Sequence, residues 1–263
     1  MTTGDRLKDK IIIVTGSGRG IGRGIALRLA AEGATLVTSS ITPGNCAKVA
    51  EEIGKAGGRA ISVPCDVSDE SAISNLVDVT VKEFGRLDVY VSNAGIELTK
   101  LALDTTAAEW DRIFQVNVRG TFLGDTIAAR AMIKQKKGKI INCGSIASHS
   151  GFLGLSAYCS TKFAVRGLTQ ALARELAQYN ITVNAYCPGV VDTDMWEQID
   201  AKMGPILGLK KKGEAMELFK KSIALGRYQT PKDVADFVSF LCSDDADYIT
   251  GQSIVTDGGI VLV

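Results

Sequence analysis

KIIIVTGSGRGIGRGIALRLA, from Lys10 to Ala30, is the stretch that decides the fold. A run of aliphatic residues precedes three glycines, Gly16, Gly20 and Gly22, and the residues after them follow a helical spacing. Glycines between a strand and a helix let the backbone turn and approach a pyrophosphate, which the free N–H groups of the helix N-terminus stabilise. The stretch therefore predicts a strand, a nucleotide-binding turn and a helix. The alternative is a tight turn that binds no ligand.

The same alternation of strand and helix continues along the chain. Short runs rich in Ile and Val alternate with longer segments of helical period. This order predicts an α/β fold: one domain over residues 1–263, with a Rossmann-type doubly wound parallel sheet and helices on both faces. We expect strands at KIIIVT, ATLVTS, RAISVPC, LDVYVS, KIINCG, ITVNAYCPG and QSIVTDGG. We expect helices at 21–32, 46–55, 71–84, from the capping box Thr106-x-x-Glu109, at 156–179, and from Thr230-Pro231 to Leu241.

Composition restricts the class of partner. The chain has 263 residues, of which 46% are hydrophobic and 22% charged, with a net charge of +1. It lacks the basic excess of a nucleic-acid binder, so a small molecule is the expected partner. Its aliphatic runs are far shorter than the roughly 20 residues of a membrane span, and its start lacks the apolar region of a signal peptide, so we expect a soluble, cytoplasmic protein without a membrane partner. Six scattered cysteines without a C-x-x-C pair predict reduced thiols and no metal site.

Residues 190–222 interrupt the alternation. They contain Met, Trp, Gly and the basic cluster Lys210–Lys212, without a clear strand pattern. A long segment after the carboxyl end of a strand lies where open α/β sheets bind ligands, so we expect a substrate lid. The alternative is a solvated insertion.

Tyr158 and Lys162, in SAYCSTKFAV, are four residues apart. On a helix they lie on one face, with Cβ atoms roughly 5–6 Å apart. At about 5 Å and an effective dielectric of about 20, the ammonium attracts a phenolate by roughly 3 kcal/mol, which favours a tyrosine that exchanges protons near neutral pH. The alternative is a half-buried core tyrosine covered by the lysine stem.

The glycine spacing is T-G-x-x-x-G-x-G, and further motifs follow it in order. They are CDVSD from Cys65, SNAG from Ser92, Asn117, Ser145, the pair Tyr158 and Lys162, and PGVVDT from Pro188. Together these motifs resemble the short-chain dehydrogenase/reductase family over essentially the whole chain. The resemblance implies an enzyme that interconverts a carbonyl and a secondary alcohol by hydride transfer with NAD(P).

The resemblance also implies catalytic roles. Negative charge develops on the carbonyl oxygen during hydride transfer, so the site needs a proton donor and a hydrogen-bond donor. Tyr158 is the implied acid in reduction and base in oxidation, with its pKa lowered by Lys162 and by the nicotinamide charge, and Ser145 is the hydrogen-bond donor. Lys162 also holds the nicotinamide ribose. Asn117 supports a water relay to Lys162, or alternatively bonds the backbone at a helix bend.

The implied cofactor site extends along the chain. The glycine loop meets the pyrophosphate, Asp66 the adenine, the Asn93 motif the adenosine side, and the Pro188 motif the carboxamide. Ser92 stands where the family's commoner motif has Asn, which predicts only a structural adjustment. The full expected set is Gly16, Ser17, Arg19, Gly20, Ile21, Gly22, Ser39, Ser40, Asp66, Val67, Asn93, Ala94, Gly95, Tyr158, Lys162, Pro188, Gly189, Val191 and Thr193.

The end of the second strand bears on the choice of cofactor. An acidic residue there would bond the ribose 2′-hydroxyl of NAD. The sequence VTSSITPG has no carboxylate; Ser39 and Ser40 can bond a 2′-phosphate, and Arg19 is placed to pair with it. We therefore expect NADP(H) to be favoured over NAD(H).

The second half of the chain bears on the substrate. NAYCPG, MWEQID, SIALGR and YITGQS resemble the acetoin (diacetyl) reductase/2,3-butanediol dehydrogenase branch. This implies a small ketone, diketone or acyloin, with a homodimer or homotetramer as the assembly. Alternatives are a sugar or polyol dehydrogenase, a broad carbonyl reductase, a 3-oxoacyl reductase, and a dinucleotide-binding sensor without catalysis. His149, Met195 and Trp196 are the expected substrate-pocket residues, although ordinary packing explains Met195 and Trp196 equally well.

Overall fold

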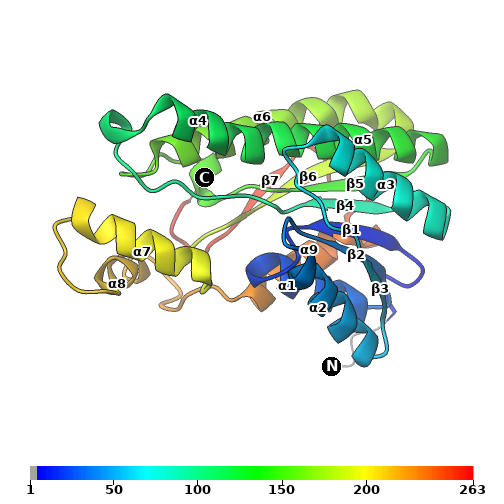
Figure 1. Cartoon of the computed structure of the whole chain (residues 1–263), viewed down its shortest axis with the longest axis horizontal. Helices are drawn as coiled ribbons and strands as arrows, with labels where there is room; N and C mark the ends of the chain where they lie inside the picture. The colour runs from blue at the N-terminus through cyan, green and yellow to red at the C-terminus, as the bar shows by residue number, and fades with distance from the viewer. Residues whose placement is uncertain (1–4, 263) are drawn as a thin grey trace.

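A seven-stranded parallel sheet forms the centre of the molecule (Figure 1). The computed structural model describes residues 5–262. The strand order is β3-β2-β1-β4-β5-β6-β7, so the order reverses between β1 and β4. Open sheets of this kind bind ligands at the carboxyl ends of the strands beside that reversal. The strands are β1 Ile11–Thr15, β2 Thr35–Ser39, β3 Arg59–Ser62, β4 Val89–Ser92, β5 Gly138–Cys143, β6 Ile181–Pro188 and β7 Ser253–Thr256.

Helices cover both faces of the sheet, as Figure 1 shows. One layer contains α1 (Gly20–Ala31), α2 (Pro43–Lys55) and α9 (Pro231–Cys242). The other contains α3 (Glu70–Phe84), α4 (Ala107–Phe114), α5 (Gly120–Gln135) and α6 (Ser156–Leu176). Helices α7 (Asp194–Ile206) and α8 (Glu214–Lys220) project to the side, beyond the sheet. The predicted doubly wound α/β fold is thus confirmed.

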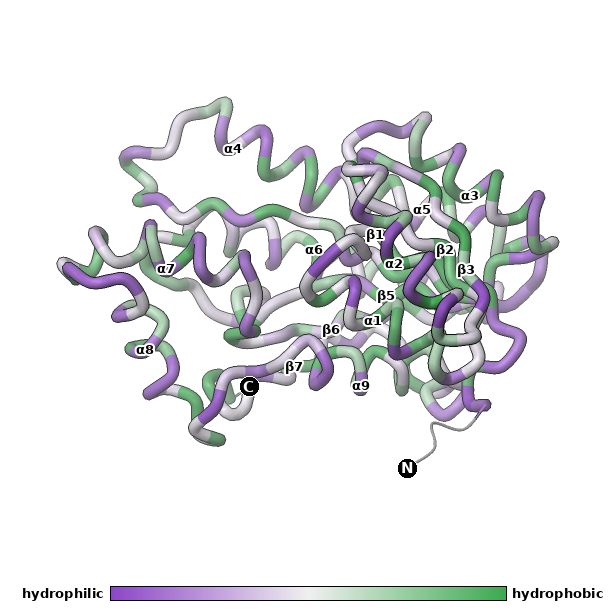
Figure 2. Tube along the Cα trace, turned by 60° about the horizontal axis from the view of Figure 1, so that its bottom comes forward, coloured by the Kyte–Doolittle hydropathy of each residue, from purple (hydrophilic) through white to green (hydrophobic). Residues whose placement is uncertain are grey.

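Two apolar layers hold the helices on the sheet. Adjacent residues of β1 point to opposite faces, so Ile12 packs in the layer under α1 and α9, and Ile13 packs in the layer under α3 and α5. Both isoleucines are fully buried. Strands buried on both faces appear as continuous apolar runs, which is why the sequence pattern located them. Figure 2 shows hydrophobic residues concentrated along the central strands.

The predicted elements agree with the structure at all seven strands and differ in detail elsewhere. The Thr106–Glu109 capping box is present, but the helix that it starts passes through a π-helical turn at Gln115–Arg119 before α5. The helix expected at 156–179 is α6, followed by a 3₁₀ turn at Ala177–Tyr179. Within residues 5–262, no helix is long and apolar enough to cross a membrane.

Candidate active site

A cavity of about 520 Å³ opens at the carboxyl ends of the strands, beside the reversal of strand order. Most of the expected site residues line it. They are Gly16, Arg19, Gly20, Ile21, Gly22, Ser40, Asp66, Val67, Asn93, Ala94, Gly95, Ser145, Tyr158, Lys162, Pro188, Gly189, Val191, Thr193, Met195 and Trp196. Four expected residues are absent from the lining: Ser17, Ser39, Asn117 and His149.

The glycine loop forms the floor of the cavity where α1 begins. Gly16 has a φ of +63°, and a Cβ there would lie 2.8 Å from the Cα of Ala94. A Cβ on Gly22 would collide with the carbonyl of Gly16, so both positions require glycine. Within the described residues, α1 has no side-chain cap and no acidic residue in its first turn. Its N-terminal N–H groups are therefore left for an anion, and the loop fits a dinucleotide pyrophosphate.

Ser145, Tyr158 and Lys162 meet at the other end of the cavity. Ser145 follows β5 and starts a 3₁₀ turn, where its hydroxyl accepts a 3.1 Å bond from the N–H of Ala147. Tyr158 and Lys162 share one face of α6, as the spacing predicted, with the Lys162 ammonium 5.5 Å from the centre of the tyrosine ring. Lys162 donates a 2.7 Å hydrogen bond to the carbonyl of Cys143. A phenol, a hydroxyl and an ammonium therefore face one cavity.

The pKa of Tyr158 differs from the expectation. Burial raises it above the ordinary value for tyrosine, and Lys162 and Ser145 lower it only in part. Lys162 alone therefore does not lower this pKa below its ordinary value, because desolvation disfavours the phenolate more than one ammonium favours it, and the lowering in the presence of the nicotinamide charge stays a prediction. For Lys162, burial has the opposite effect and lowers the pKa. The neighbouring ionisable groups Cys143, Tyr158 and Cys187 raise it, so that the pKa of Lys162 lies above its ordinary value. Lys162 thus keeps its charge at neutral pH.

Asn117 lies in the π-helical turn between α4 and α5, almost fully buried. Its Oδ1 accepts a 2.9 Å bond from the N–H of Ile96, and its Nδ2 donates to the Ile96 carbonyl at 2.9 Å and to the Thr161 hydroxyl at 3.3 Å. Gly95 lies next to it: a Cβ there would be 3.2 Å from Asn117 Oδ1 and 4.0 Å from Lys162 Nζ. These contacts match the backbone-bonding alternative, and the water relay remains a prediction.

The serines at the end of β2 have opposite surroundings. Ser40 lines the cavity, and its hydroxyl donates a 2.7 Å bond to the carbonyl of Thr42. Ser39 is 1% exposed, and its hydroxyl has no partner within residues 5–262. Its side chain is buried and does not line the cavity, so the geometry gives no support to the expectation that Ser39 bonds the cofactor, which stays a prediction. Ser17 is also buried: its hydroxyl accepts a 2.8 Å bond from the N–H of Ser39, so it ties the glycine loop to β2.

Arg19 lines the cavity but already has an anionic neighbour. Its guanidinium lies 3.7 Å from the carboxylate of Asp194, at the start of α7, and both side chains are exposed. Exposed pairs of this kind contribute little and exchange partners readily. Arg19 therefore remains able to reach an anion in the cavity.

An apolar cluster packs around Tyr158, beside the cavity. Tyr158 and Trp196 pack against buried residues that include Leu155 and Met203, and Phe152 packs there too. Trp196 lies edge-on to Phe219 of α8, with ring centres 5.3 Å apart. Met195 and Trp196 line the cavity as expected.

His149 does not line this cavity. It ends the 3₁₀ turn after Ser145 and lies beside Arg166 of α6 and Ser253 of β7. Burial, and then Arg166, lower its pKa below the ordinary value for histidine. This position gives no support to the expectation that His149 contacts the substrate, which stays a prediction.

Other lining residues were not predicted. Most are neighbours of predicted ones, so the motifs could have been extended to include them. Nothing in the sequence indicated that Arg112 on α4 lines the cavity, because exposed arginines are common on helices. The additional residues are Gly18, Ile41, Thr42, Asn45, Cys65, Ile96, Arg112, Val116, Cys143, Gly144 and Asp194.

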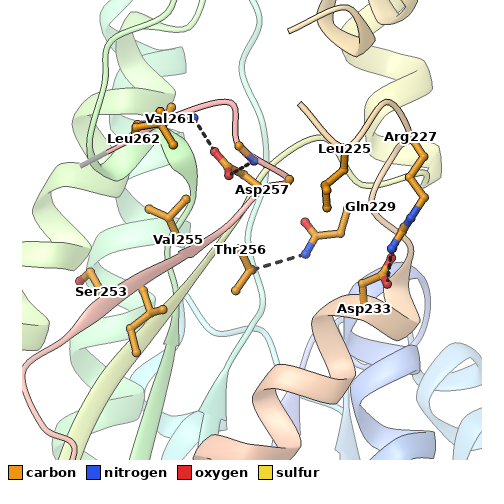
Figure 3. Close-up of a pocket in the computed structure, with 13 residues that line it drawn as sticks. Leu225, Arg227, Gln229, Asp233, Ser253, Val255, Thr256, Asp257, Val261 and Leu262 are labelled. Atoms are coloured by element: carbon orange, nitrogen blue, oxygen red, sulfur yellow. Dashed lines mark hydrogen bonds and ion pairs between the residues drawn. The ribbon is translucent and has the colours of Figure 1, made fainter. Parts of the chain in front are cut away.

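A second, more open cavity of about 740 Å³ lies beside β7 (Figure 3). Its polar groups bond one another. Arg227 pairs with Asp233 at 2.7 Å, and Asp257 accepts bonds from the N–H groups of Gly259 and Val261 at 2.9 and 2.7 Å. It contains none of the predicted site residues.

Known proteins resemble the chain over nearly its whole length. Residues 16–261 match the family model described as "Enoyl-(Acyl carrier protein) reductase". The chain is 47% identical to a diacetyl reductase [(S)-acetoin forming] of Staphylococcus epidermidis and 45% identical to an L-2,3-butanediol dehydrogenase of Corynebacterium glutamicum, in each case over 96% of this chain and 98% of the relative. The crystal structure of levodione reductase superposes with a TM-score of 0.91 at 33% identity, over 96% of this chain and 97% of that one. The chain therefore belongs to the short-chain dehydrogenase/reductase family and is an NAD(P)-dependent oxidoreductase of carbonyl and alcohol groups.

Proposed function

We propose that the protein interconverts small ketones, diketones or acyloins with their secondary alcohols. Diacetyl, acetoin and 2,3-butanediol are the type of substrate that we expect. One observation carries this proposal: Ser145 and Tyr158 face a cavity that Trp196 and Met195 also line, beside an apolar cluster that packs around Tyr158. Such a lining suits a compact substrate with methyl groups on a carbonyl, and offers a sugar few hydrogen bonds. The names of the similar diacetyl reductase and butanediol dehydrogenase support the same class.

In the proposed mechanism, Tyr158 and Ser145 hold the substrate oxygen. When bound, the nicotinamide cofactor supplies or accepts the hydride. During reduction, Ser145 donates a hydrogen bond to the oxygen as negative charge develops, and Tyr158 transfers its phenolic proton there. In oxidation, the Tyr158 phenolate accepts the alcohol proton. The apolar wall excludes water from this exchange.

Lys162 and Asn117 support Tyr158 in this proposal. The Lys162 ammonium stabilises the phenolate and is placed to bond the nicotinamide ribose. Asn117 fixes the backbone of Ile96 and so the cavity wall at Gly95. As the family resemblance implies, Lys162 would return a proton to the Tyr158 phenolate after reduction, and a water beside Asn117 would then replace that proton on Lys162.

For the cofactor, we propose that NADP(H) is preferred. The cavity beside β2 offers the hydroxyl of Ser40 and no carboxylate from the strand end, and Arg19 is within the same lining. A 2′-phosphate carries nearly two negative charges, which a guanidinium and hydroxyls stabilise better than they stabilise a 2′-hydroxyl. Asp194, beside Arg19, opposes this preference, so it should be moderate.

We also propose a cytoplasmic homodimer or homotetramer. Large apolar side chains are exposed on neighbouring helices: Trp110 on α4, Phe122 on α5 and Phe163 on α6 are 38%, 48% and 44% exposed. Apolar surface of this kind is typical of contacts between subunits. Light scattering coupled to gel filtration measures the assembly directly.

The test is a substrate panel followed at the nicotinamide absorbance band. Diacetyl, acetoin, a simple ketone, a sugar and a 3-oxoacyl thioester are compared by kcat/KM with each cofactor. The proposal requires diacetyl or acetoin to exceed the thioester and the sugar by at least about tenfold, which is about 1.4 kcal/mol. Preference for the thioester would make the protein a 3-oxoacyl reductase, and cofactor binding without turnover on any compound would make it a sensor.

A further inference from the structure

Helices α7 and α8 form one unit with its own contacts. Asp200 of α7 is 4% exposed, and its carboxylate accepts bonds from the N–H groups of Gly213 and Met216 at 2.6 and 2.8 Å. These bonds fix the start of α8 on α7. Trp196 and Phe219 join the two helices a second time. Movement of α7 therefore carries Trp196 and Met195, which line the substrate end of the cavity.

The unit is fixed to the sheet at its base. Val191 pairs with Gln229, and the N–H groups of Asp192 and Gln229 bond the carbonyls of Gln229 and Val190 at 2.9 Å each. Beyond this base, two ion pairs join residues 190–222 to the rest of the described chain. They are Arg19 with Asp194 and Glu97 with Lys202.

The two pairs differ in burial. The Arg19 and Asp194 side chains are 70% and 74% exposed, whereas that of Glu97 is only 5% exposed and that of Lys202 is 48% exposed. Solvent and salt screen the first pair strongly. The carboxylate of Glu97 is removed from water, so the loss of its cationic partner has a larger effect.

Glu97 belongs to a loop that is itself held firmly. Ile96 is bonded on both sides by Asn117, and the Thr99 hydroxyl donates a 2.8 Å bond to the Glu97 carboxylate. Lys100 donates its N–H to the carbonyl of Gly154 at 2.8 Å and pairs with Glu109 of α4 at 2.9 Å. This loop leaves the cavity at Ile96 and provides a fixed point outside it.

The same part of α7 touches the segment that leads to Tyr158. A Cβ on Gly154 would lie 3.1 Å from Ile206 and 3.4 Å from Met203, so both side chains pack closely over that glycine. Met203 is 1% exposed. Apolar packing is not directional, but the adjacent Lys202 adds a contact that fixes the position of the helix along the loop.

We propose that Glu97 and Lys202 are positioning residues for the substrate: their ion pair holds α7 so that Trp196 and Met195 close the cavity over a small carbonyl compound. We refer to Glu97 and Lys202 as the latch pair. Neither residue lines the cavity, so the pair acts through α7. The assignment of a substrate to this cavity rests on the proposed function.

The test compares Glu97→Gln, Lys202→Met, the double variant and Lys202→Arg, with diacetyl as the probe substrate. Each charge-removing single variant should raise KM for diacetyl about three- to tenfold, because substrate binds less well when α7 lies away from the cavity. The same variants should change kcat and the KM for cofactor less than twofold. The double variant should be no worse than the worse single variant, since both remove one interaction. Lys202→Arg keeps the cation and should restore KM to within about twofold of the natural protein.

Lys212→Met is the matched control. Lys212 lies 3.8 Å from Glu197 within the same unit, and both side chains are exposed. This variant removes a lysine from a Lys–Glu pair without touching the latch pair, so KM should not change. Raising the salt concentration should raise KM of the natural protein only slightly, because the Glu97 carboxylate is buried and salt screens its pair with Lys202 weakly, and it should leave KM of Lys202→Met nearly unchanged.

A second readout does not need turnover. Amide hydrogen exchange in residues 194–206 should be faster in Lys202→Met than in the natural protein and in Lys212→Met. Unchanged exchange and unchanged KM in both single variants would overturn the latch pair. If the natural protein reduces no member of the substrate panel, the proposed function fails instead, and the exchange measurement still decides whether the pair holds α7.

Discussion

The Lys162 ammonium lies 5.5 Å from the centre of the Tyr158 ring while it donates a 2.7 Å hydrogen bond to the carbonyl of Cys143. The second contact anchors the lysine to the end of β5. Its charge therefore acts on the phenol from a fixed position in the protein alone. Because burial still raises the pKa of Tyr158, the phenol is protonated at neutral pH before the cofactor binds. That protonation state suits an acid in carbonyl reduction.

Tyr158→Phe should lower kcat for reduction about a hundredfold or more, because it removes the proton donor and little else. The unfolding temperature and the affinity for the cofactor should stay near those of the natural protein. Steady-state kinetics and cofactor titration by fluorescence measure the two properties separately. Turnover near that of the natural protein would assign proton transfer to another group.

Lys162→Met should weaken cofactor binding and also lower kcat, since one ammonium serves both the ribose and the phenol. It should also shift the pH dependence of alcohol oxidation. Lys162 lowers the pKa of Tyr158, so its removal raises that pKa, and oxidation, which needs the phenolate, should rise only at higher pH than in the natural protein. A pH profile of kcat/KM for oxidation measures this shift. An unchanged profile with unchanged cofactor affinity would contradict both roles.

Ser40→Asp should move cofactor preference toward NAD by about 1–3 kcal/mol, roughly ten- to a hundredfold in the ratio of kcat/KM values. Ser40 lines the cavity, so a carboxylate there repels a 2′-phosphate and can bond a ribose hydroxyl. Ser39→Ala is the control, because Ser39 is buried and should not affect the ratio. If the natural protein already prefers NAD and Ser40→Asp leaves the ratio unchanged, the proposed NADP preference is wrong.

Ser39 and Ser40 show which features of the site the sequence predicts and which it does not. The glycine spacing and the apolar runs predicted β2 and the turn beside it, because these features are local. Which of two adjacent serines faces the cavity depends on the orientation of the last residue of the strand. Both faces of β2 are buried, so the sequence has no polar and apolar alternation to indicate that orientation.

Contacts between segments that are distant in the chain could not be predicted from the sequence either. His149 lies beside Ser253 of β7, about a hundred residues later in the chain, and no local pattern encodes that neighbour. Helices α7 and α8 were not predicted within 190–222, although that segment was expected after a strand's carboxyl end. Their apolar residues Ile199, Met203 and Ala215 pack on one another and near Tyr158 rather than on the sheet.

Asp125 gives the last prediction, which concerns stability. Its carboxyl is completely buried on α5, where it accepts a 2.9 Å bond from the Nδ2 of Asn142. Asn142 also donates to the Thr169 hydroxyl at 3.1 Å. Within residues 5–262, one Asp125 oxygen, one Asn142 oxygen and the hydroxyl of Tyr90 are buried without partners. Burial raises the pKa of Asp125 to about 8, and the bond from Asn142 offsets this only in part.

The sign of the pH effect follows from the raised pKa. In the unfolded chain Asp125 loses its proton near pH 4, whereas in the folded protein it keeps the proton until about pH 8. Between these values the folded state binds more protons, so this group's contribution to stability is complete below about pH 4 and is lost as pH rises toward 8. The loss is about 1.4 kcal/mol per pH unit. The variant Asp125→Asn cannot ionise at this position, so it should lack this dependence of stability on pH. Its free energy of unfolding, measured with denaturant, should therefore increase relative to that of the natural protein from pH 5 to pH 8. All other titrating groups are common to both proteins, so they cancel in the difference between the two free energies of unfolding. If that difference does not depend on pH, Asp125 is ionised in the folded protein with a pKa near its ordinary value.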